Sequence, residues 1–432
     1  MTSLTIGLIG IGVLIVLLFS RMHIGVCMGV VGFVGFAVVV GWSPALGILK
    51  TVPYSTFSSQ QLSVIPLFML MGAFCFAAGL STDLYNAVYA WLGNLPGGLA
   101  MATVAACACF AAISGSSLAT VATIGAVALP EMKRFNYDSS LATGSIAAGG
   151  CIGILIPPSV ILILYGIITE QSIGKLFLAG FIPGVMEAVF YILVILFLTW
   201  RNPNLGPRGQ KTSFREKWVA LTKTWEVITL FVVVIGGLYL GLFTPTEAAG
   251  VGAFGAFIVT LIRKRLNWAR LKEALVSTCL TSGMLFTIIL GAMIFGYFLS
   301  VTRLPTELAT FVSGLAVNRY IVLCAILAVL LVLGCFMDSM AIVLLTVPIF
   351  YPLIHNLGFS AIWFGILVVR TTEMGLISPP VGLNVYVLKG MTDVPLESIF
   401  RGVIPFLVAD FLQLAFLIAI PEITLFLPHL MS

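Results

Sequence analysis

The sequence predicts an all-α membrane protein that crosses the bilayer many times, and three observations point to this fold class. Hydrophobic residues make up 60% of the 432 residues and charged residues only 9%, whereas soluble domains carry about 25% charged residues. The apolar runs are long and continuous, unlike the short alternating segments of a membrane β-barrel. Similar segments also recur in the same order in both halves of the chain.

The apolar runs predict ten full spans. The first starts close to the N-terminus, which lacks the basic start and small-residue cleavage site of a signal peptide. The spans are expected at 4–20, 24–41, 64–90, 139–170, 177–200, 226–243, 246–262, 277–300, 359–390 and 398–426. Two other stretches, 97–130 and 317–350, each hold two short apolar segments around small polar residues, which predicts two re-entrant helical hairpins.

The distribution of basic residues predicts a periplasmic N-terminus. In this orientation 16 of the 21 Lys and Arg residues fall on the cytoplasmic side, as the positive-inside rule requires. Two segments that mix basic and aromatic residues, 205–223 and 264–275, are expected to lie on the cytoplasmic surface as amphipathic arms. A solvated linker is the alternative for each of them.

Four matched segments indicate that residues 211–432 repeat residues 1–210. GILIPPS at 153–159 returns as GLISPPV at 375–381, and Pro183 returns as Pro405, both 222 positions later. The segments ending at Ser81 and Ser300 match at an offset of 219, and those ending at Pro130 and Pro348 at 218. Because each half holds five full spans, the second half enters the membrane from the opposite face. Such inverted-topology repeats are typical of secondary transporters.

A pair of prolines interrupts one apolar span in each half, at Pro157–Pro158 and Pro379–Pro380. Proline removes a backbone donor and clashes with the preceding turn, so we expect discontinuous helices at 139–170 and 359–390. Freed carbonyl groups can bind Na⁺, and the positive ends of half-helices can face an anion. A simple proline kink is the alternative.

The turns of the two predicted hairpins carry oxygen ligands. The first, ISGSSLAT at 113–120, offers the hydroxyl groups of Ser114, Ser116, Ser117 and Thr120. The second, GCFMDSM at 334–340, aligns Asp338 with Thr120, and a carboxylate at membrane depth usually marks a site. The alternatives are serines that cap two short helices and an Asp at a water-facing edge.

Two further charges lie just before the second proline pair. Arg370 and Glu373 are three positions apart on a helix, so they could pair with each other. Alternatively, Arg370 could bind a carboxylate or sulfonate of a substrate, and Asn384 could supply a neutral hydrogen bond. The candidate substrate contacts are Ser116, Thr120, Pro157, Arg370, Thr372, Glu373, Pro379 and Asn384.

The motifs SGSSLAT, TIGAVALPEM, AAGGCIGILIPPS, MDSMAIVLLTVP and GLISPPVGLN together resemble the large membrane subunit of TRAP (tripartite ATP-independent periplasmic) transporters over nearly the whole chain. The resemblance implies an elevator mechanism in the bacterial inner membrane, driven by two or more Na⁺ ions. It implies two partners, a small four-helix membrane subunit and a periplasmic substrate-binding protein. That protein would deliver an organic-acid anion such as sialate, a C4-dicarboxylate, a sugar acid or a sulfonate.

Carried onto this chain, the family's sodium sites comprise Ser114, Ser117, Gly153, Ile156 and Pro158 at the first break, and Gly334, Asp338, Gly375, Ser378 and Val381 at the second. One departure concerns the first tip, where the family usually has Asp and this chain has Thr120. The missing carboxylate bears on the charge at the first ion site and on the number of ions carried.

Other functional classes have less support in the sequence. There is no GxxxxGK[ST] loop for an ATP-driven pump, and the serine-rich tip lacks the GxSxG context of a hydrolase. The eight cysteines show no metal-ligand spacing, and the net charge of +5 reflects topology and does not indicate nucleic-acid binding. We therefore expect neither an enzyme nor an organic cofactor. A self-sufficient Na⁺-coupled carboxylate carrier, an ion antiporter and an ion channel remain as alternatives.

Overall fold

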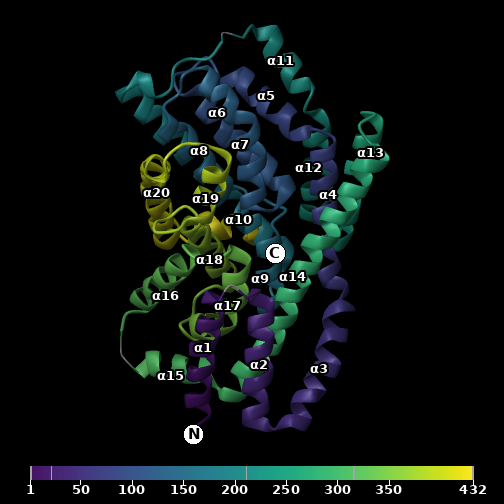
Figure 1. Cartoon of the computed structure of the whole chain (residues 1–432), viewed down its shortest axis with the longest axis vertical. Coiled ribbons are helices and arrows are strands. Elements are labelled where there is room, and N and C mark those ends of the chain that lie inside the picture. The colour runs from purple at the N-terminus through teal and green to yellow at the C-terminus, as the bar shows by residue number, and fades with distance from the viewer. Residues whose placement is uncertain (1, 21, 211, 315–316, 431–432) are drawn as a thin grey trace.

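The computed structural model describes residues 2–20, 22–210, 212–314 and 317–430, and this part of the chain is helical with no strand. Figure 1 shows the elements in chain order. The helices of the first half are α1 Ser3–Phe19, α2 Ile24–Val40, α3 Trp42–Phe57, α4 Val64–Ala77, α5 Leu80–Leu92, α6 Gly98–Ser114, α7 Ser117–Arg134, α8 Ser139–Ile152, α9 Val160–Thr169 and α10 Ile173–Arg201. Those of the second half are α11 Phe214–Thr222, α12 Trp225–Tyr239, α13 Pro245–Ile262, α14 Trp268–Thr302, α15 Leu304–Gly314, α16 Arg319–Gly334, α17 Ser339–Asn356, α18 Ala361–Gly375, α19 Leu383–Met391, α20 Leu396–Ala419 and α21 Glu422–His429.

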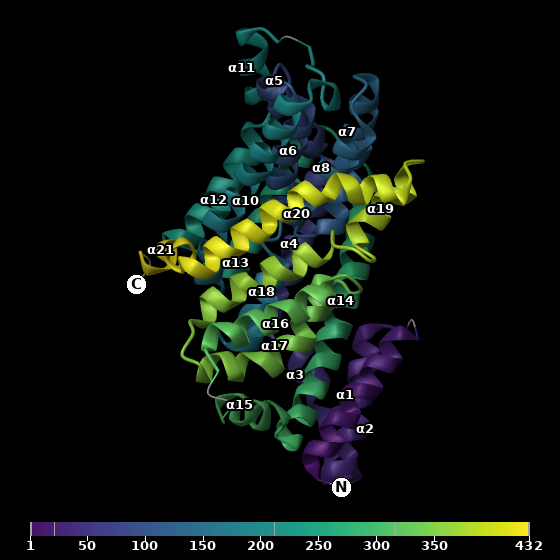
Figure 2. The same ribbon diagram turned by 90° about the vertical axis from the view of Figure 1, so that its left-hand side faces the viewer.

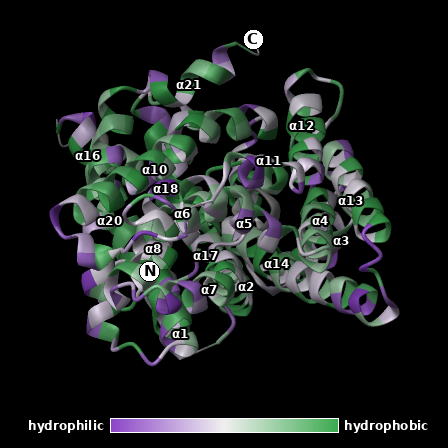
Figure 3. Ribbon diagram, turned by 90° about the horizontal axis from the view of Figure 1, so that it is seen from above, coloured by the Kyte–Doolittle hydropathy of each residue, from purple (hydrophilic) through white to green (hydrophobic). Residues whose placement is uncertain are grey.

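The length and composition of the helices suit a membrane. Six of the described helices are long and apolar enough to span a bilayer, and the bent pair α11–α12 makes a seventh candidate. Many large apolar side chains are exposed, as at Val16 and Leu280, which are 68% and 70% exposed, and Figure 3 shows hydrophobic residues along most of the helices. Soluble proteins rarely expose so much contiguous apolar surface.

The same order of elements occurs twice in the chain. A helical hairpin, α6–α7 or α16–α17, is followed by a helix that breaks at a proline pair, α8–α9 or α18–α19. Both proline pairs contain a cis peptide bond. Helices thus end near both tips and at both proline pairs, while the re-entry of the hairpins into the membrane and the inverted topology of the halves stay predictions.

Several boundaries differ from the sequence prediction. The span expected at 64–90 is two helices, because Gly79 takes a left-handed backbone angle (φ +72°) that separates α4 from α5. The arm expected at 264–275 is not separate, since α14 runs without a break from Trp268 to Thr302. Helices α3 and α15 lie in segments for which no helix was predicted.

Packing divides the buried apolar residues into two clusters. One is built around α2, α4, α13 and α14 and extends to α9 and α16–α18. The other is built around α6, α7, α8, α10 and α20, and α20 crosses this part of the molecule obliquely in Figure 2. The two breaks lie where the clusters meet, because Leu155 and Met374 belong to the first cluster and Ile156 and Leu376 to the second.

Candidate functional site

The first hairpin tip packs against the first break. Gly115 has a left-handed backbone angle (φ +61°), and a Cβ atom there would lie 3.2 Å from Cγ2 of Val160 and 3.8 Å from the carbonyl oxygen of Pro158. The turn thus approaches the break closely because it carries a glycine, which accepts this angle without steric cost.

The second hairpin tip packs against the second break. A Cβ atom on Gly334 would lie 2.8 Å from the Cα of Gly375, so the backbones of α16 and α18 touch where both helices end. The amide of Gly382 donates to the carbonyl of Cys335 at 3.2 Å, and the Cys335 thiol donates to the carbonyl of Pro379 at 3.3 Å. These contacts place the terminal carbonyls of α16 and α18 side by side.

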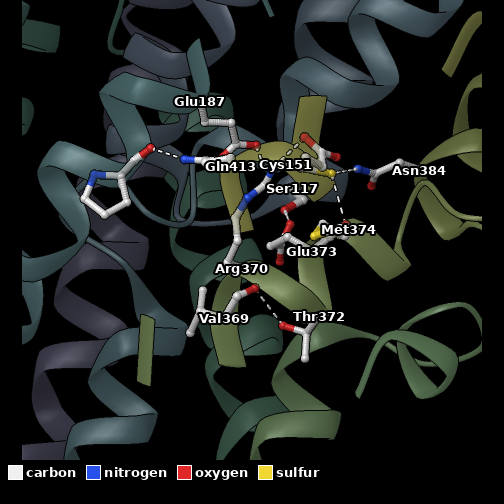
Figure 4. A network of polar contacts seen from close by, with 12 residues as sticks. Ser117, Cys151, Glu187, Val369, Arg370, Thr372, Glu373, Met374, Asn384 and Gln413 are labelled. Carbon is white, nitrogen blue, oxygen red and sulfur yellow. Dashed lines mark hydrogen bonds and ion pairs between the residues drawn. The ribbon is translucent and has the colours of Figure 1, made fainter. Parts of the chain in front are cut away.

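The two halves of the chain meet between the breaks (Figure 4). The hydroxyl of Ser117, at the first tip, donates to Oε2 of Glu373, on α18 before the second break. The Cys151 thiol donates to the backbone carbonyl of Glu373 at 3.3 Å. The amide nitrogen of Asn384, past the second break, lies 3.2 Å from the carbonyl oxygen of Ala147, to which it donates. Two hairpin tips and two broken helices therefore converge on one region.

Helix ends give this region its electrostatic character. Three helices begin here with side-chain caps: Ser116 accepts from Ala119 N at 3.4 Å, Asp338 from Met340 N at 3.1 Å, and Ser159 from Leu162 N at 3.3 Å. Helix N-termini carry partial positive charge and C-termini partial negative charge. Carbonyl and hydroxyl oxygens suit a hard cation such as Na⁺, while the N-termini suit an anion.

The expected sodium ligands of the first set gather around the first break. Gly153, Ile156 and Pro158 are buried in the break itself, and Ser117 is buried beside it. The side chain of Ser114 lies outside the described residues. The donor set is made of neutral oxygens, and Oε1 of the buried Glu373 next to Ser117 makes no hydrogen bond, so the residues present fit a cation.

The expected ligands of the second set lie around the second tip and break. Gly334 and Gly375 are in backbone contact, while Asp338 and Val381 are half-buried. The Ser378 hydroxyl donates to the carbonyl of Met374 at 2.7 Å, within its own turn. Among the described residues, no three or more His, Cys, Asp or Glu side chains lie together in a way that could hold a metal ion.

Arg370 does not pair with Glu373, as its spacing suggested. Its guanidinium lies 3.0 Å from Glu187 on α10 and forms a second ion pair with Asp410 on α20. All three side chains are fully buried, so Arg370 is not available to a substrate. The sequence prediction missed Glu187 and Asp410. Both are acidic residues inside apolar helices, and such residues usually mark a paired or functional position.

The other candidate substrate contacts fall into exposed and buried groups. Ser116 is half-buried and faces a cavity described below, and Pro379 is exposed, whereas Pro157 is buried. Thr120 and Thr372 are fully buried, and their hydroxyls donate to the carbonyls of Ser116 and Val369 at 2.8 and 2.9 Å. Thr120 and Thr372 thus support the backbone near the site.

A cavity of about 570 Å³ lies beside the hairpin tips, between α4, α7, α17 and the first half of α14. Ser116 and Asp338 contribute to its wall from the two tips. Three charged residues, Arg265, Arg270 and Glu273, line it near the start of α14. The cavity therefore joins the region of the tips to a basic end of the molecule, and its size suits a small organic molecule.

Comparison with known proteins identifies the family. Residues 11–423 match the family model described as tripartite ATP-independent periplasmic transporter, DctM component. The chain is 36% identical over 401 residues to the C4-dicarboxylate TRAP transporter large permease protein DctM of Pseudomonas aeruginosa, covering 90% of this chain and 93% of that protein. It is 32% identical to the sialic acid TRAP transporter large permease protein SiaM of Vibrio cholerae, covering 85% and 86%.

Two solved structures share the fold. The Neisseria gonorrhoeae MtrF structure gives a TM-score of 0.59 at 13% identity, covering 88% of this chain and 85% of that one. The Alcanivorax borkumensis YdaH transporter gives 0.55 at 15% identity, covering 89% and 88%. At such low identity this similarity concerns the arrangement of helices alone. The match over residues 11–423 and the long apolar helices show that the chain belongs to the TRAP transporter family as its DctM component, a multi-pass large permease protein of the inner membrane.

Proposed function

We propose that this chain carries out Na⁺-coupled secondary active uptake of an organic-acid anion as the large membrane subunit of a TRAP transporter. The observation that carries the proposal is the convergence of both hairpin tips and both broken helices, at the Ser117–Glu373 and Gly334–Gly375 contacts. Broken helices of this kind form the ion and substrate sites of secondary transporters.

The proposal includes two Na⁺ sites, one at each break. The first uses Ser117 with backbone around Gly153, Ile156 and Pro158, and the second uses Asp338 with backbone around Gly334 and Gly375. The absence of a carboxylate at Thr120 leaves the first site with neutral ligands, and the carboxyl group of Glu373 lies next to Ser117. Binding of Na⁺ would neutralise Asp338 and draw the second tip toward its break, which couples the ion to the local structure.

The organic acid would occupy the cavity beside the tips. The half-buried Ser116 offers a hydroxyl there, and Arg265 and Arg270 line the wall with positive charge. Relatives of this chain are named for C4-dicarboxylate, sialic acid and 2,3-diketo-L-gulonate, all of them organic acids. If the basic segments face the cytoplasm, as the positive-inside rule predicts, the cavity opens to the cytoplasm.

Transport would follow an elevator mechanism between two inverted repeats, residues 1–210 and 211–432. The hairpins and broken helices would form the moving part, while α14 and the helices packed on it, α2 and α4, would form the fixed part. The matched order of hairpin and broken helix in both halves supports this division. An inverted pair of repeats can exchange conformations and thus open either face.

Two protein partners are proposed, a small four-helix membrane subunit and a periplasmic substrate-binding protein. The family description names the system as tripartite. A relative from Oleidesulfovibrio alaskensis, named isethionate TRAP transporter permease protein DctMQ, is longer than this chain, which covers 61% of it. The remaining length of that relative could accommodate a fused small subunit.

The test is uptake into proteoliposomes that contain this chain and its small subunit, with the cognate binding protein outside. A panel of organic acids would be assayed with and without an inward Na⁺ gradient. Uptake of one acid that needs both the gradient and the binding protein would support the proposal. Uptake without any partner would favour a self-sufficient carrier, and ion conduction independent of the Na⁺ gradient would favour a channel.

A further inference from the structure

A second polar cluster lies in the interior, where α10, α18 and α20 meet. Arg370 forms ion pairs with Glu187, at 3.0 Å, and with Asp410. The side chains of all three residues have zero exposure to solvent. None of the three belongs to the proposed Na⁺ sites, and none lines the cavity beside the tips. The transport function proposed above therefore leaves this cluster unused.

The charges in the cluster do not balance. Two carboxyl groups face one guanidinium, so the fully ionised cluster carries a net charge of −1. Glu187 Oε2 and Asp410 Oδ2 make no hydrogen bond, and neither does Arg370 Nε. Half of each carboxyl group is therefore buried with only the Tyr191 hydroxyl beside it, which also makes no hydrogen bond.

The neighbouring groups offer no compensating positive charge. The titratable side chains that face the cluster are Tyr191 from α10, Cys151 from α8 and Glu373 from α18, and none of these is a cation at neutral pH. Gln413 on α20 uses its amide nitrogen to donate to the carbonyl of Pro183 at 2.6 Å. The described surroundings thus leave the negative charge uncompensated.

Buried charges without a partner are strongly disfavoured and usually become neutral by gaining or losing a proton. We propose that Glu187 and Asp410 together hold one proton, so that the cluster consists of one ionised carboxylate, one neutral carboxylic acid and one guanidinium. The proton belongs to the pair and not to one residue, because both carboxyl groups face the same cation. The proposed site is a proton-binding site in the interior of this chain.

A proton fits this cluster better than a metal ion. The guanidinium of Arg370 lies between the two carboxyl groups and bonds to both, so a cation that bridged them would be repelled by Arg370. A proton needs only one of the free oxygens, and the Tyr191 hydroxyl, which faces both carboxyl groups, lies close to them.

The position of the cluster gives the proton a structural consequence. Helices α10 and α20 follow the two broken helices in the chain, and Arg370 joins both of them to α18. With the proton bound, the cluster is neutral, and its ion pairs hold α18 against α10 and α20. In the unfolded chain a carboxyl group loses its proton at about pH 4, whereas the folded cluster keeps one. Stability therefore falls as pH rises above that range, because the folded state has to hold a proton that the unfolded chain has released.

The direct test is infrared spectroscopy of the purified protein in H₂O and D₂O, which detects the carbonyl stretching band of a protonated carboxylic acid. Glu187→Gln and Asp410→Asn each remove the excess carboxyl group, so each is expected to abolish one such band of the wild-type protein. Glu373→Gln is the matched control, since it removes another buried carboxyl group and must leave the band of the pair in place. A spectrum that is unchanged in both single variants would overturn the proposal.

Thermal unfolding as a function of pH provides the second readout. The wild-type protein is expected to lose stability as pH rises above about 4–5, and both single variants to lose less, because their clusters are neutral without a proton. The double variant Glu187→Gln/Asp410→Asn leaves Arg370 unpaired and is expected to be less stable than either single variant at every pH. Single variants whose stability depends on pH as strongly as that of the wild type would contradict the proposal. Neither readout needs substrate or Na⁺, so the outcome is independent of the transport function.

Discussion

Ser117 at the first hairpin tip hydrogen-bonds to Glu373 on the second broken helix, across 256 positions of the sequence. Both residues are buried, and the second carboxyl oxygen of Glu373 makes no hydrogen bond. The Ser117 hydroxyl is thus a main polar contact of a buried carboxyl group, and it ties the first half of the chain to the second.

The first prediction concerns the stability of this link. Ser117→Ala would remove the donor to the buried carboxyl group of Glu373, and leaving a buried polar group without its hydrogen bond costs about 1–3 kcal/mol. We expect the melting temperature of the purified protein to fall. Ser145→Ala is the matched control, because the buried Ser145 hydroxyl bonds only within its own helix, to Ala142 at 3.0 Å. An equal loss of stability in both variants would show that the Ser117–Glu373 contact stabilises the protein no more than a hydrogen bond within one helix.

The second prediction concerns the charge at the second tip. Asp338→Asn would remove the carboxylate but keep a good helix cap, since Asn and Asp are similar at this position. We expect the protein to stay folded and its uptake to lose most of its dependence on Na⁺, measured as initial uptake against Na⁺ concentration. Neutral oxygens bind cations more weakly than a carboxylate, so Ser117→Ala should reduce the apparent Na⁺ affinity less than Asp338→Asn.

Asp138 supplies a control for that experiment. It caps α8 by accepting from Ser140 N at 2.9 Å, as Asp338 caps α17, but it lies outside the proposed sites. Asp138→Asn should leave the dependence on Na⁺ unchanged. If Asp338→Asn also left it unchanged, the second Na⁺ site would have to be abandoned.

The third prediction concerns the contact between the second tip and its break. Gly334→Ala would place a Cβ atom 2.8 Å from the Cα of Gly375, and forcing such atoms apart costs roughly 1–3 kcal/mol. We expect a lower melting temperature and a weaker apparent Na⁺ affinity, because the carbonyls of both helix ends would separate. Gly283→Ala on α14, where a Cβ atom would meet nothing within 4 Å, should leave both quantities unchanged, and a similar effect at both positions would refute this explanation.

The fourth prediction concerns a junction of three helices. Arg263, at the end of α13, lies 3.0 and 2.9 Å from the two carboxyl oxygens of Glu226 on α12 and also pairs with Asp83 on α5. Lysine cannot reproduce this forked geometry, so Arg263→Lys should lower stability by roughly 1–3 kcal/mol.

A surface ion pair serves as the comparison for Arg263. Arg134 is exposed and lies 3.8 Å from Glu131, and exposed pairs of this kind contribute about 0–1 kcal/mol. Thermal unfolding of Arg134→Lys should therefore resemble that of the wild type. An Arg263→Lys protein as stable as the wild type would mean that charge alone, without the fork, holds the three helices together.

The sequence predicted those parts of the fold that leave a local or repeated pattern. The proline pairs at 157–158 and 379–380 and the small polar residues of the two tips recur at nearly one offset, so the hairpins and breaks were recognisable. The break at Gly79 was not recognised, because a single glycine inside an apolar run is common in membrane helices.

Contacts between distant segments left no such pattern. The spacing of Arg370 and Glu373 suggested a pair within one helix, but tertiary packing brings Glu187 and Asp410 to Arg370 instead. The contact of Ser117 with Glu373 likewise depends on how the two halves meet, which neither composition nor periodicity encodes. Acidic residues inside apolar helices are a usable signal of such contacts, although they do not identify the partner.

Helix α14 is one unbroken rod of 35 residues, which at 1.5 Å per residue measures about 52 Å. The hydrocarbon layer of a bilayer is only about 30 Å thick. The rod must therefore tilt, project beyond the lipid, or do both, and it cannot shorten to follow a thinner membrane. Lipids beside α14 would have to adjust their own height, so membrane thickness is a variable to which this protein should be mechanically sensitive.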